Sequence, residues 1–289
     1  MSDRHTLAAA PADTASAPAL ITLAELLARR RRDGTLVQFE VTPDWAQGRT
    51  TFGGLLSTLA VQAMRDVCGA DWPLRALQTN FVGPVAVGGF EVEVTLLRQG
   101  KNVRQVQARV TQADASGQPQ VAAVLLGVFG TGRESALAPL TVAQPALVTP
   151  PDKHVRWPYI PGVTPAFTQH METYHADGGM PYTGSPDFFS RVQTRLKQAA
   201  GVDAELLTVL LADVGPTPAL ATLRAPAAAS SVSWALELRP LPADVGDGLW
   251  RMDKTALATG EGYVNEKTEL WAPDGQLAGL GYQVVAVYA

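Results

Sequence analysis

The sequence contains very little cysteine and no excess of positive charge. Its 289 residues include one cysteine, Cys68, which excludes an intramolecular disulfide and fits a reducing, cytoplasmic compartment. The formal net charge is -4, and lysine and arginine form no stripe interleaved with aromatic residues. Binding of nucleic acid requires a broad positive field, so we expect no nucleic-acid partner.

Several signatures of targeting and catalysis are also missing. The first twenty residues carry Asp3 and Asp13 and no continuous apolar run, which predicts neither a signal peptide nor a membrane span. Ser57 lacks the second glycine of a GxSxG elbow, and no Walker A or GxGxxG motif follows an expected strand. His170 and His175 are five residues apart in an expected strand and would face opposite sides, so we expect no metal site there.

The sequence contains the same order of elements twice. Hydrophobic residues make up 46% of the chain, enough for substantial cores. The residue pattern of each half predicts a strand, a helix and antiparallel strands joined by short turns. This order is typical of an α+β fold and disfavours a doubly wound nucleotide-binding fold. The expected strands are 36–41, 74–82, 90–97, 103–112, 120–129, 166–174, 188–196, 230–238, 249–257, 263–271 and 277–288, and the expected helices are 22–29, 55–67 and 203–213.

Proline marks the expected boundary between the halves. Residues 131–163 are rich in proline and show no sustained periodicity, which is typical of a linker. The chain therefore divides into an N-terminal tail with a short helix (1–33), a first unit (34–130), the linker (131–163) and a second unit (164–289).

The repeat is imperfect, and the imperfection indicates where chemistry is carried out. Thr95–Gly100 returns as Thr255–Gly260, and each half ends in an apolar run. The first run, 121–129, has no polar side chain, whereas the second, 280–288, has Gln283 in its middle. We therefore expect the residues that carry out chemistry to lie in the second half, and the first half to be structural.

Four short motifs occur in order along the chain. They are Phe52-Gly53-Gly54, Phe81-Val82-Gly83-Pro84, Arg98-Gln99-Gly100-Lys101-Asn102 and Leu238-Arg239-Pro240. In this order they resemble the motifs of the acyl-CoA thioesterase II group, and the resemblance covers the chain from about residue 34 to its end. The resemblance implies a double hotdog, with two antiparallel sheets that each wrap around a long helix, so that one chain imitates a dimer. It also implies hydrolysis of a fatty acyl-CoA to free acid and CoA, without a metal or redox cofactor.

The same resemblance leads us to expect a particular arrangement of the halves. The two sheets would join edge to edge, with the helices on opposite outer sides of the continuous sheet. Sheet edges would remain open, which favours a homo-oligomer.

The resemblance also implies a catalytic Asp, Thr and Gln in the second half. Thr255 and Gln283 fall on the Thr and Gln positions, but Val232 occupies the Asp position and cannot orient a water molecule. Asp213, at the end of an apolar helical run, is the candidate replacement, because burial would raise its pKa and make it a general base.

The start of the first-half helix is a candidate substrate-binding element. Unpaired N–H groups after Phe52, at Gly53 and Gly54, could form an oxyanion hole, because glycine lets a substrate approach and the helix dipole favours negative charge.

Each candidate has a structural alternative. Asp213 precedes Val-Gly-Pro and could bond to turn amides, Gln283 could satisfy a local backbone group, Thr255 is an ordinary strand residue, and Gly53 and Gly54 could serve close packing. The function has alternatives too: a non-catalytic protein that binds an acyl group or CoA, or a pure scaffold. The hydrolase is favoured if Asp213 and Gln283 reach one pocket together with Thr255, within hydrogen-bond distance of a shared water molecule. The binding protein is favoured if Asp213 points into a turn, and the scaffold only if no groove opens between the two helices.

Overall fold

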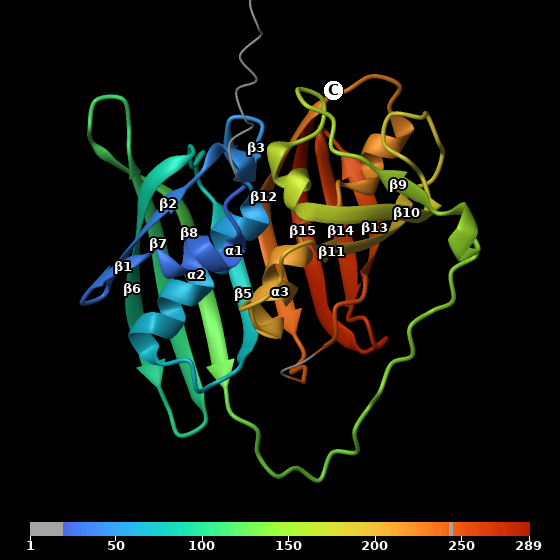
Figure 1. The fold of residues 1–289 in the computed structure, drawn as a ribbon. Coiled ribbons are helices and arrows are strands. Elements are labelled where there is room, and N and C mark those ends of the chain that lie inside the picture. The colour runs from blue at the N-terminus through green and yellow to red at the C-terminus, as the bar shows by residue number, and fades with distance from the viewer. Residues whose placement is uncertain (1–19, 243–244) are drawn as a thin grey trace, which may run out of the picture.

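The computed structural model describes residues 20–242 and 245–289, and these form one long, curved antiparallel sheet with its helices on one face (Figure 1). The expected α+β architecture is confirmed. From edge to edge the thirteen strands are β1 (Arg31–Asp33), β2 (Leu36–Val41), β6 (Gly88–Gln99), β7 (Val103–Ala113), β8 (Pro119–Gly130), β5 (Leu74–Phe81), β12 (Ala228–Leu238), β15 (Leu277–Tyr288), β14 (Tyr263–Trp271), β13 (Trp250–Gly260), β11 (Phe189–Leu196), β10 (Met171–Gly178) and β9 (Val155–Trp157).

The two halves join through β5 and β12, which pair antiparallel in the middle of the sheet. Thr79 lies opposite Trp234, and both side chains are buried. A two-stranded ribbon, β3 (Ala46–Gln47) with β4 (Thr50–Thr51), lies outside this sheet. The pairing of β5 with β12 makes the two expected sheets continuous.

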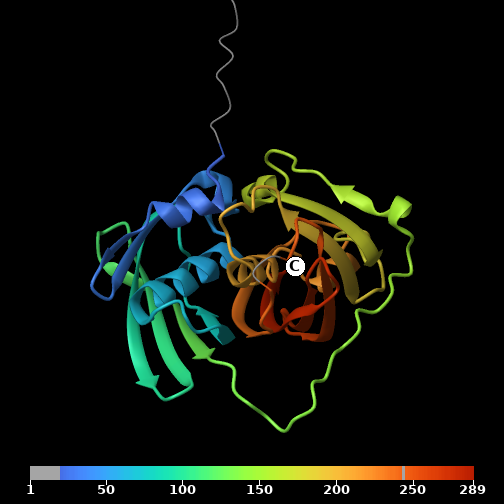
Figure 2. The same ribbon diagram turned by 60° about the horizontal axis from the view of Figure 1, so that its bottom comes forward.

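The resemblance implies helices on opposite sides of the sheet, and this expectation is wrong. The two main helices, α2 (Gly53–Cys68) and α3 (Ala204–Leu211), pack against each other on the same face, and the sheet curves around both (Figures 1 and 2). A Cβ atom on Gly54 would lie 2.7 Å from the carbonyl oxygen of Leu210, so the helix backbones are in direct contact. Burial of both apolar helices under one curved sheet is the physical reason for the difference.

The local sequence explains where the helices begin and end. The expected helix at 22–29 forms as α1 (Leu23–Ala28), and a capping box between Thr22 and Glu25 fixes its start. Asp203 caps α3 by accepting the N–H of Leu206 at 3.0 Å. The helix ends before Gly215 and Pro216, so Asp213 lies just beyond its last turn.

Most expected strands form, with changed ends. Residues 166–170 of the expected strand 166–174 instead form the 3₁₀ helix η3 (Ala166–His170), which leads into β10. Phe167 stacks on Phe52 and His170 stacks on Trp45, each with ring centroids 3.9 Å apart. Residues three apart lie on one side of a 3₁₀ helix, so this conformation lets both rings dock on the first half.

The segment between the halves contains some regular structure. The 3₁₀ helix η2 (Pro151–Lys153) and strand β9 lie within 131–163, and β9 pairs with β10. The four-part division of the chain stays a prediction, and the part of the tail at 1–19 lies outside the described residues. In the described ranges, no helix combines the length and apolar character needed to cross a bilayer.

The contact between the two helices yields a stability prediction. Replacing Gly54 by Ala would place a methyl group against the Leu210 carbonyl oxygen and the Phe52 ring. We expect the free energy of unfolding to fall by about 1–3 kcal/mol, as for other overpacked cores. In contrast, Gly89→Ala places its methyl group in open space, so urea denaturation should show a change below about 0.5 kcal/mol. Equal effects of the two substitutions would contradict close helix contact.

Candidate functional site

A cavity of about 600 Å³ opens where the end of α3 meets the start of α2. The sheet forms its floor through β12, β15, β14 and β13, and the loop after β5 forms part of its wall. Its polar lining includes Asp213, Ser231, Lys254, Glu266 and Gln283. Two candidate residues from distant parts of the sequence, Asp213 and Gln283, therefore meet here.

Asp213 lies over the first turn of α2. Its Oδ1 accepts a hydrogen bond from Gln283 Nε2 at 2.8 Å, and a Cβ atom on Gly53 would lie 2.9 Å from Oδ2. Only glycine leaves room for the carboxylate at this point. Burial raises the pKa of Asp213 to about 6, and the charge of Glu266 adds to the rise, whereas Lys254, Gln283 and the Gly54 N–H oppose it.

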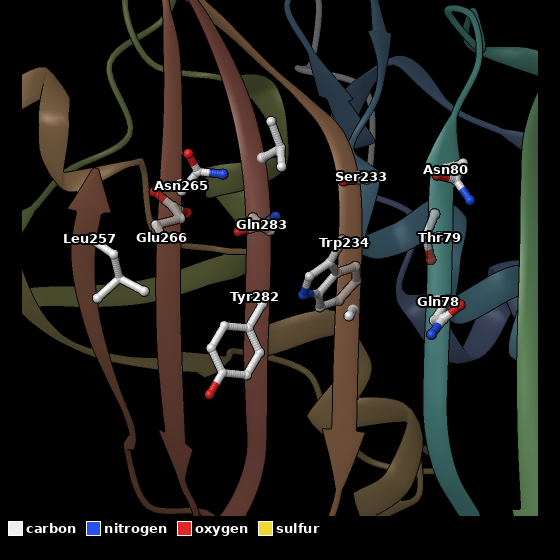
Figure 3. Close-up of a pocket in the computed structure, with 12 residues that line it drawn as sticks. Gln78, Thr79, Asn80, Ser233, Trp234, Leu257, Asn265, Glu266, Tyr282 and Gln283 are labelled. Atoms are coloured by element: carbon white, nitrogen blue, oxygen red, sulfur yellow. The ribbon is translucent and has the colours of Figure 1, made fainter. Parts of the chain in front are cut away.

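Gln283 is the central polar side chain of the site. It is 5% exposed and faces the helices, whereas its strand neighbour Tyr282 is 48% exposed on the other face, as strand alternation requires. Gln283 lies between Trp234 on β12 and Glu266 on β14 (Figure 3). Its Nε2 also contacts the Ser231 hydroxyl oxygen at 3.2 Å.

Lys254 and Glu266 were missed in the sequence. They form an ion pair at 2.8 Å, and each residue is 2% exposed. Lys254 Nζ also donates to the Gly215 carbonyl oxygen at 2.9 Å and to Gln283 Oε1 at 3.3 Å. Strand alternation could have revealed Glu266 in the sequence. Glu266 lies two residues from Val264 and two from Thr268, which are both buried, so it belongs to the inward face of the strand.

A β-bulge in β12 changes the direction of the Val232 side chain. The register passes from Ser231 opposite Val285 to Ser233 opposite Val284, so Val232 is an inserted residue. Its side chain is 42% exposed, while Ser231 contacts Gln283. Counting back along a regular strand could not reveal that Ser231 is the residue directed at the site.

The structure does not bring Thr255 to Asp213 and Gln283. Thr255 follows Lys254 on β13, and successive strand residues point to opposite faces. Lys254 points toward the cavity, so Thr255 points away from it, in register with Lys267. The resemblance placed Thr255 in the catalytic group, and strand alternation is the physical reason for the difference.

The three residues expected to bind substrate have different surroundings. Phe52 is buried in its stack with Phe167 and does not line the cavity. Gly53 lines the cavity directly, and the N–H of Gly54 is directed to Asp213. The start of α2 therefore reaches the site through Gly53, with Phe52 as a packing residue beneath it.

The opposite end of the helix pair carries ion pairs beside a smaller cavity of about 220 Å³. Arg65 of α2 bonds to Asp203 at 2.8 Å and lies 3.7 Å from Glu205, both at the start of α3. Glu205 also accepts the N–H of Leu74 at 2.7 Å. The charged side chains at this end pair with one another, whereas Asp213 at the other end pairs with the Gln283 amide, so the two ends of the helix pair differ.

The described side chains do not form a metal centre. No group of three or more His, Cys, Asp or Glu residues within 20–242 and 245–289 is arranged to hold a metal ion.

Matches to protein families cover both halves of the chain. Residues 41–130 match the acyl-CoA thioesterase N-terminal domain, and residues 146–287 match the acyl-CoA thioesterase C-terminal domain. A comparison with proteins of curated function gave no match.

Solved structures share the fold at low sequence identity. A protein of unknown function with a hot dog fold from Alicyclobacillus acidocaldarius is 19% identical, with a TM-score of 0.80 over 93% of this chain and 99% of its own. Acyl-CoA thioesterase II TesB2 from Mycobacterium marinum is 16% identical, with a TM-score of 0.68 over 92% of this chain and 98% of its own. The dehydratase domain of PpsC from Mycobacterium tuberculosis, solved in complex with C12:1-CoA, is 16% identical, with a TM-score of 0.54 over 89% of this chain and 97% of its own.

The solved structures confirm the expected double hotdog fold. The two domain matches occur in the order of the two halves of the sheet and together span most of the sequence. The chain belongs to the acyl-CoA thioesterase family and carries its N-terminal and C-terminal domains in tandem.

Proposed function

We propose that this protein hydrolyses a fatty acyl-CoA thioester to the free acid and CoA. The observation that carries the proposal is the convergence of Asp213, Gln283 and the start of α2 on one cavity. Family membership supports acyl-CoA as the ligand. Hydrolysis requires a general base, donors for an oxyanion and a site for the acyl chain, and the cavity offers all three.

Asp213 is the proposed general base. It takes a proton from a water molecule, and the resulting hydroxide attacks the thioester carbon to form a tetrahedral oxyanion. Collapse of that intermediate breaks the carbon–sulfur bond, and the proton held by Asp213 passes to the departing thiolate. The pKa of about 6 lets Asp213 both accept this proton and release it near neutral pH.

Ser231 and Gly53 complete the proposed site. Ser231 Oγ accepts from Gln283 Nε2, so its own hydrogen can point to the water or to the thioester oxygen. The first N–H groups of α2 have no partner within the helix, and Gly53, at the start of α2, lines the cavity. The positive end of the helix dipole then stabilises the developing oxyanion.

The cavity also has an apolar wall suited to an acyl chain. Burial of methylene groups against such a wall contributes about 0.8 kcal/mol for each group. The apolar lining residues include Leu56, Phe81, Val85, Leu220 and Val285.

A thiol-release assay with acyl-CoAs of graded length tests the hydrolase. We expect Asp213→Asn to lower kcat/KM about 10²–10⁴-fold, because it removes the base and keeps the shape of the side chain. Gln283→Ala should lower kcat/KM about tenfold or more, because Asp213 loses its hydrogen-bond donor. Thr255→Ala is the matched control, and we expect a change of less than about threefold, since Thr255 faces away from the cavity.

Two outcomes would contradict the proposed roles. Equal turnover in the wild type, Asp213→Asn and Gln283→Ala would exclude this group as the catalytic site. Absence of turnover with every acyl-CoA, combined with tight binding of acyl-CoA by the wild type, would favour the non-catalytic binding protein instead.

The pH dependence follows from the state that a general base requires. Asp213 acts as the carboxylate, so activity should be lost as the pH falls through the raised pKa. We expect kcat/KM to rise with pH with a midpoint at about 6. A profile whose acidic limb lies near pH 4 would contradict a buried Asp213 as the base, and this limb should be absent from the residual activity of Asp213→Asn.

The raised pKa also has a consequence for stability. An acid whose pKa rises from 3.8 to about 6 on folding binds its proton more tightly in the folded state. Its ionisation therefore destabilises the fold progressively as the pH increases from about 4 to about 6, and by a constant amount above that range.

We therefore expect Asp213→Asn to be more stable than the wild type at pH 8, by about 3 kcal/mol. The difference should shrink toward zero as the pH is lowered to about 4. Urea denaturation of the two proteins at a series of pH values measures it, and a pH-independent difference would contradict a buried, ionised carboxylate.

A further inference from the structure

We propose that Lys254 and Glu266 are a pair of positioning residues that fix the Gln283 side-chain amide and, through it, the Asp213 carboxylate. The kinetic consequences of this inference rest on the proposed hydrolysis. The effect of the pair on the Asp213 carboxylate can be tested without turnover. Neither residue belongs to the group that the family resemblance places in the site.

The hydrogen-bond geometry assigns Lys254 this indirect role. Its ammonium group has three N–H donors and no acceptor. Three acceptors surround it, namely Glu266 Oε1 at 2.8 Å, the Gly215 carbonyl oxygen at 2.9 Å and Gln283 Oε1 at 3.3 Å. Lys254 therefore forms two hydrogen bonds and one ion pair within the protein, and it acts on the reaction through Gln283.

The charges on both sides of Gln283 dictate the orientation of its amide. Lys254 can only donate, so Gln283 Oε1 must face it, and an ionised Asp213 can only accept, so Gln283 Nε2 must face that carboxylate. The reversed amide would oppose oxygen to carboxylate and NH₂ to ammonium. The sequence of contacts from Glu266 to Asp213 thus permits one arrangement.

Stability alone does not explain the pair. Both residues are 2% exposed, and a buried ion pair of this kind is often no more stabilising than apolar residues of similar volume. Among the described residues, Lys254 is the partner of the Glu266 carboxylate, whose oxygens accept no well-aligned hydrogen bond. The pair therefore holds a buried charge beside Gln283 despite the unfavourable free energy of desolvation, as expected if that charge has a role there.

The charged groups that act on Asp213 are this same pair. Around its carboxylate, α2 contributes the Gly54 N–H and β15 contributes the neutral Gln283, while β13 and β14 contribute Lys254 and Glu266. Lys254 lowers the pKa of Asp213 and Glu266 raises it. Removal of either charge should therefore move the titration of Asp213, and the two removals should move it in opposite directions.

The experiment uses Lys254→Met and Glu266→Gln in the full chain, with two readouts. Titration of the Asp213 carboxyl by ¹³C NMR needs no turnover, and the pH profile of kcat/KM reports the same group during hydrolysis. We expect the Asp213 titration to move up by about one pH unit or more in Lys254→Met and down in Glu266→Gln. In Lys254→Met, kcat should fall about tenfold or more while KM changes less than about threefold, because substrate contacts remain.

Two further variants separate positioning from loss of structure. Lys254→Met/Glu266→Leu removes both charges, so the titration of Asp213 should return toward that of the wild type while kcat stays low, because nothing orients Gln283. Lys267→Met removes a β14 lysine whose partner, Glu269, lies outside the cavity lining, and it should leave kcat and the titration unchanged. If Lys254→Met does not fold, Glu266→Gln and the double variant provide the same comparison.

The readouts also separate this inference from the proposed function. Opposite shifts of the Asp213 titration in proteins that hydrolyse no acyl-CoA would support the pair and overturn the hydrolase. An unmoved titration in folded, active variants would overturn the pair and leave the hydrolase standing, as would wild-type kcat in the double variant.

Discussion

Antiparallel pairing of β5 with β12 determines the rest of the molecule, because it joins the two halves into one curved sheet. The continuous sheet curves around both helices on its inner face (Figure 2), and the start of α2 lies beside the end of α3. Direct backbone contact at Gly54 and Leu210 holds them there. A chemical site at this junction therefore requires both halves, even though most of its polar side chains come from the second.

Electrostatics at the junction depend on a balance between burial and a few fixed partners. Burial raises the pKa of Asp213 to about 6, and the charge of Lys254, the Gln283 amide and the Gly54 N–H keep it from rising further. A carboxyl group poised near neutral pH is suited to accept and return a proton. At the other end of the helices, Arg65 pairs with Asp203 and lies close to Glu205, so that a cation there faces two acidic residues.

Sequence patterns predicted the elements well where apolar periodicity was strong, as in β5, β12, β14, β15 and the core of α2. Gln283 and Asp213 could be found because each interrupts or ends an apolar run. The common face of the helices and the bulge at Val232 could not, because both depend on pairing between distant strands. In the sequence, Lys254 and Glu266 look like ordinary charged residues of two strands. Only the strand pairing, together with the alternation of side chains along each strand, shows that both face the cavity and that Thr255 faces away from it.

The proposed hydrolysis requires that a thioester binds between Asp213 and the start of α2. A crystal structure of the Asp213→Asn protein with an intact acyl-CoA tests this most directly, because the substrate would survive in place. We predict that the thioester oxygen lies within hydrogen-bond distance of the Gly53 N–H, with the carbonyl carbon facing the residue 213 amide and the acyl chain along Leu56 and Val285. A thioester bound on the opposite face of the sheet, beside Thr255, would contradict it.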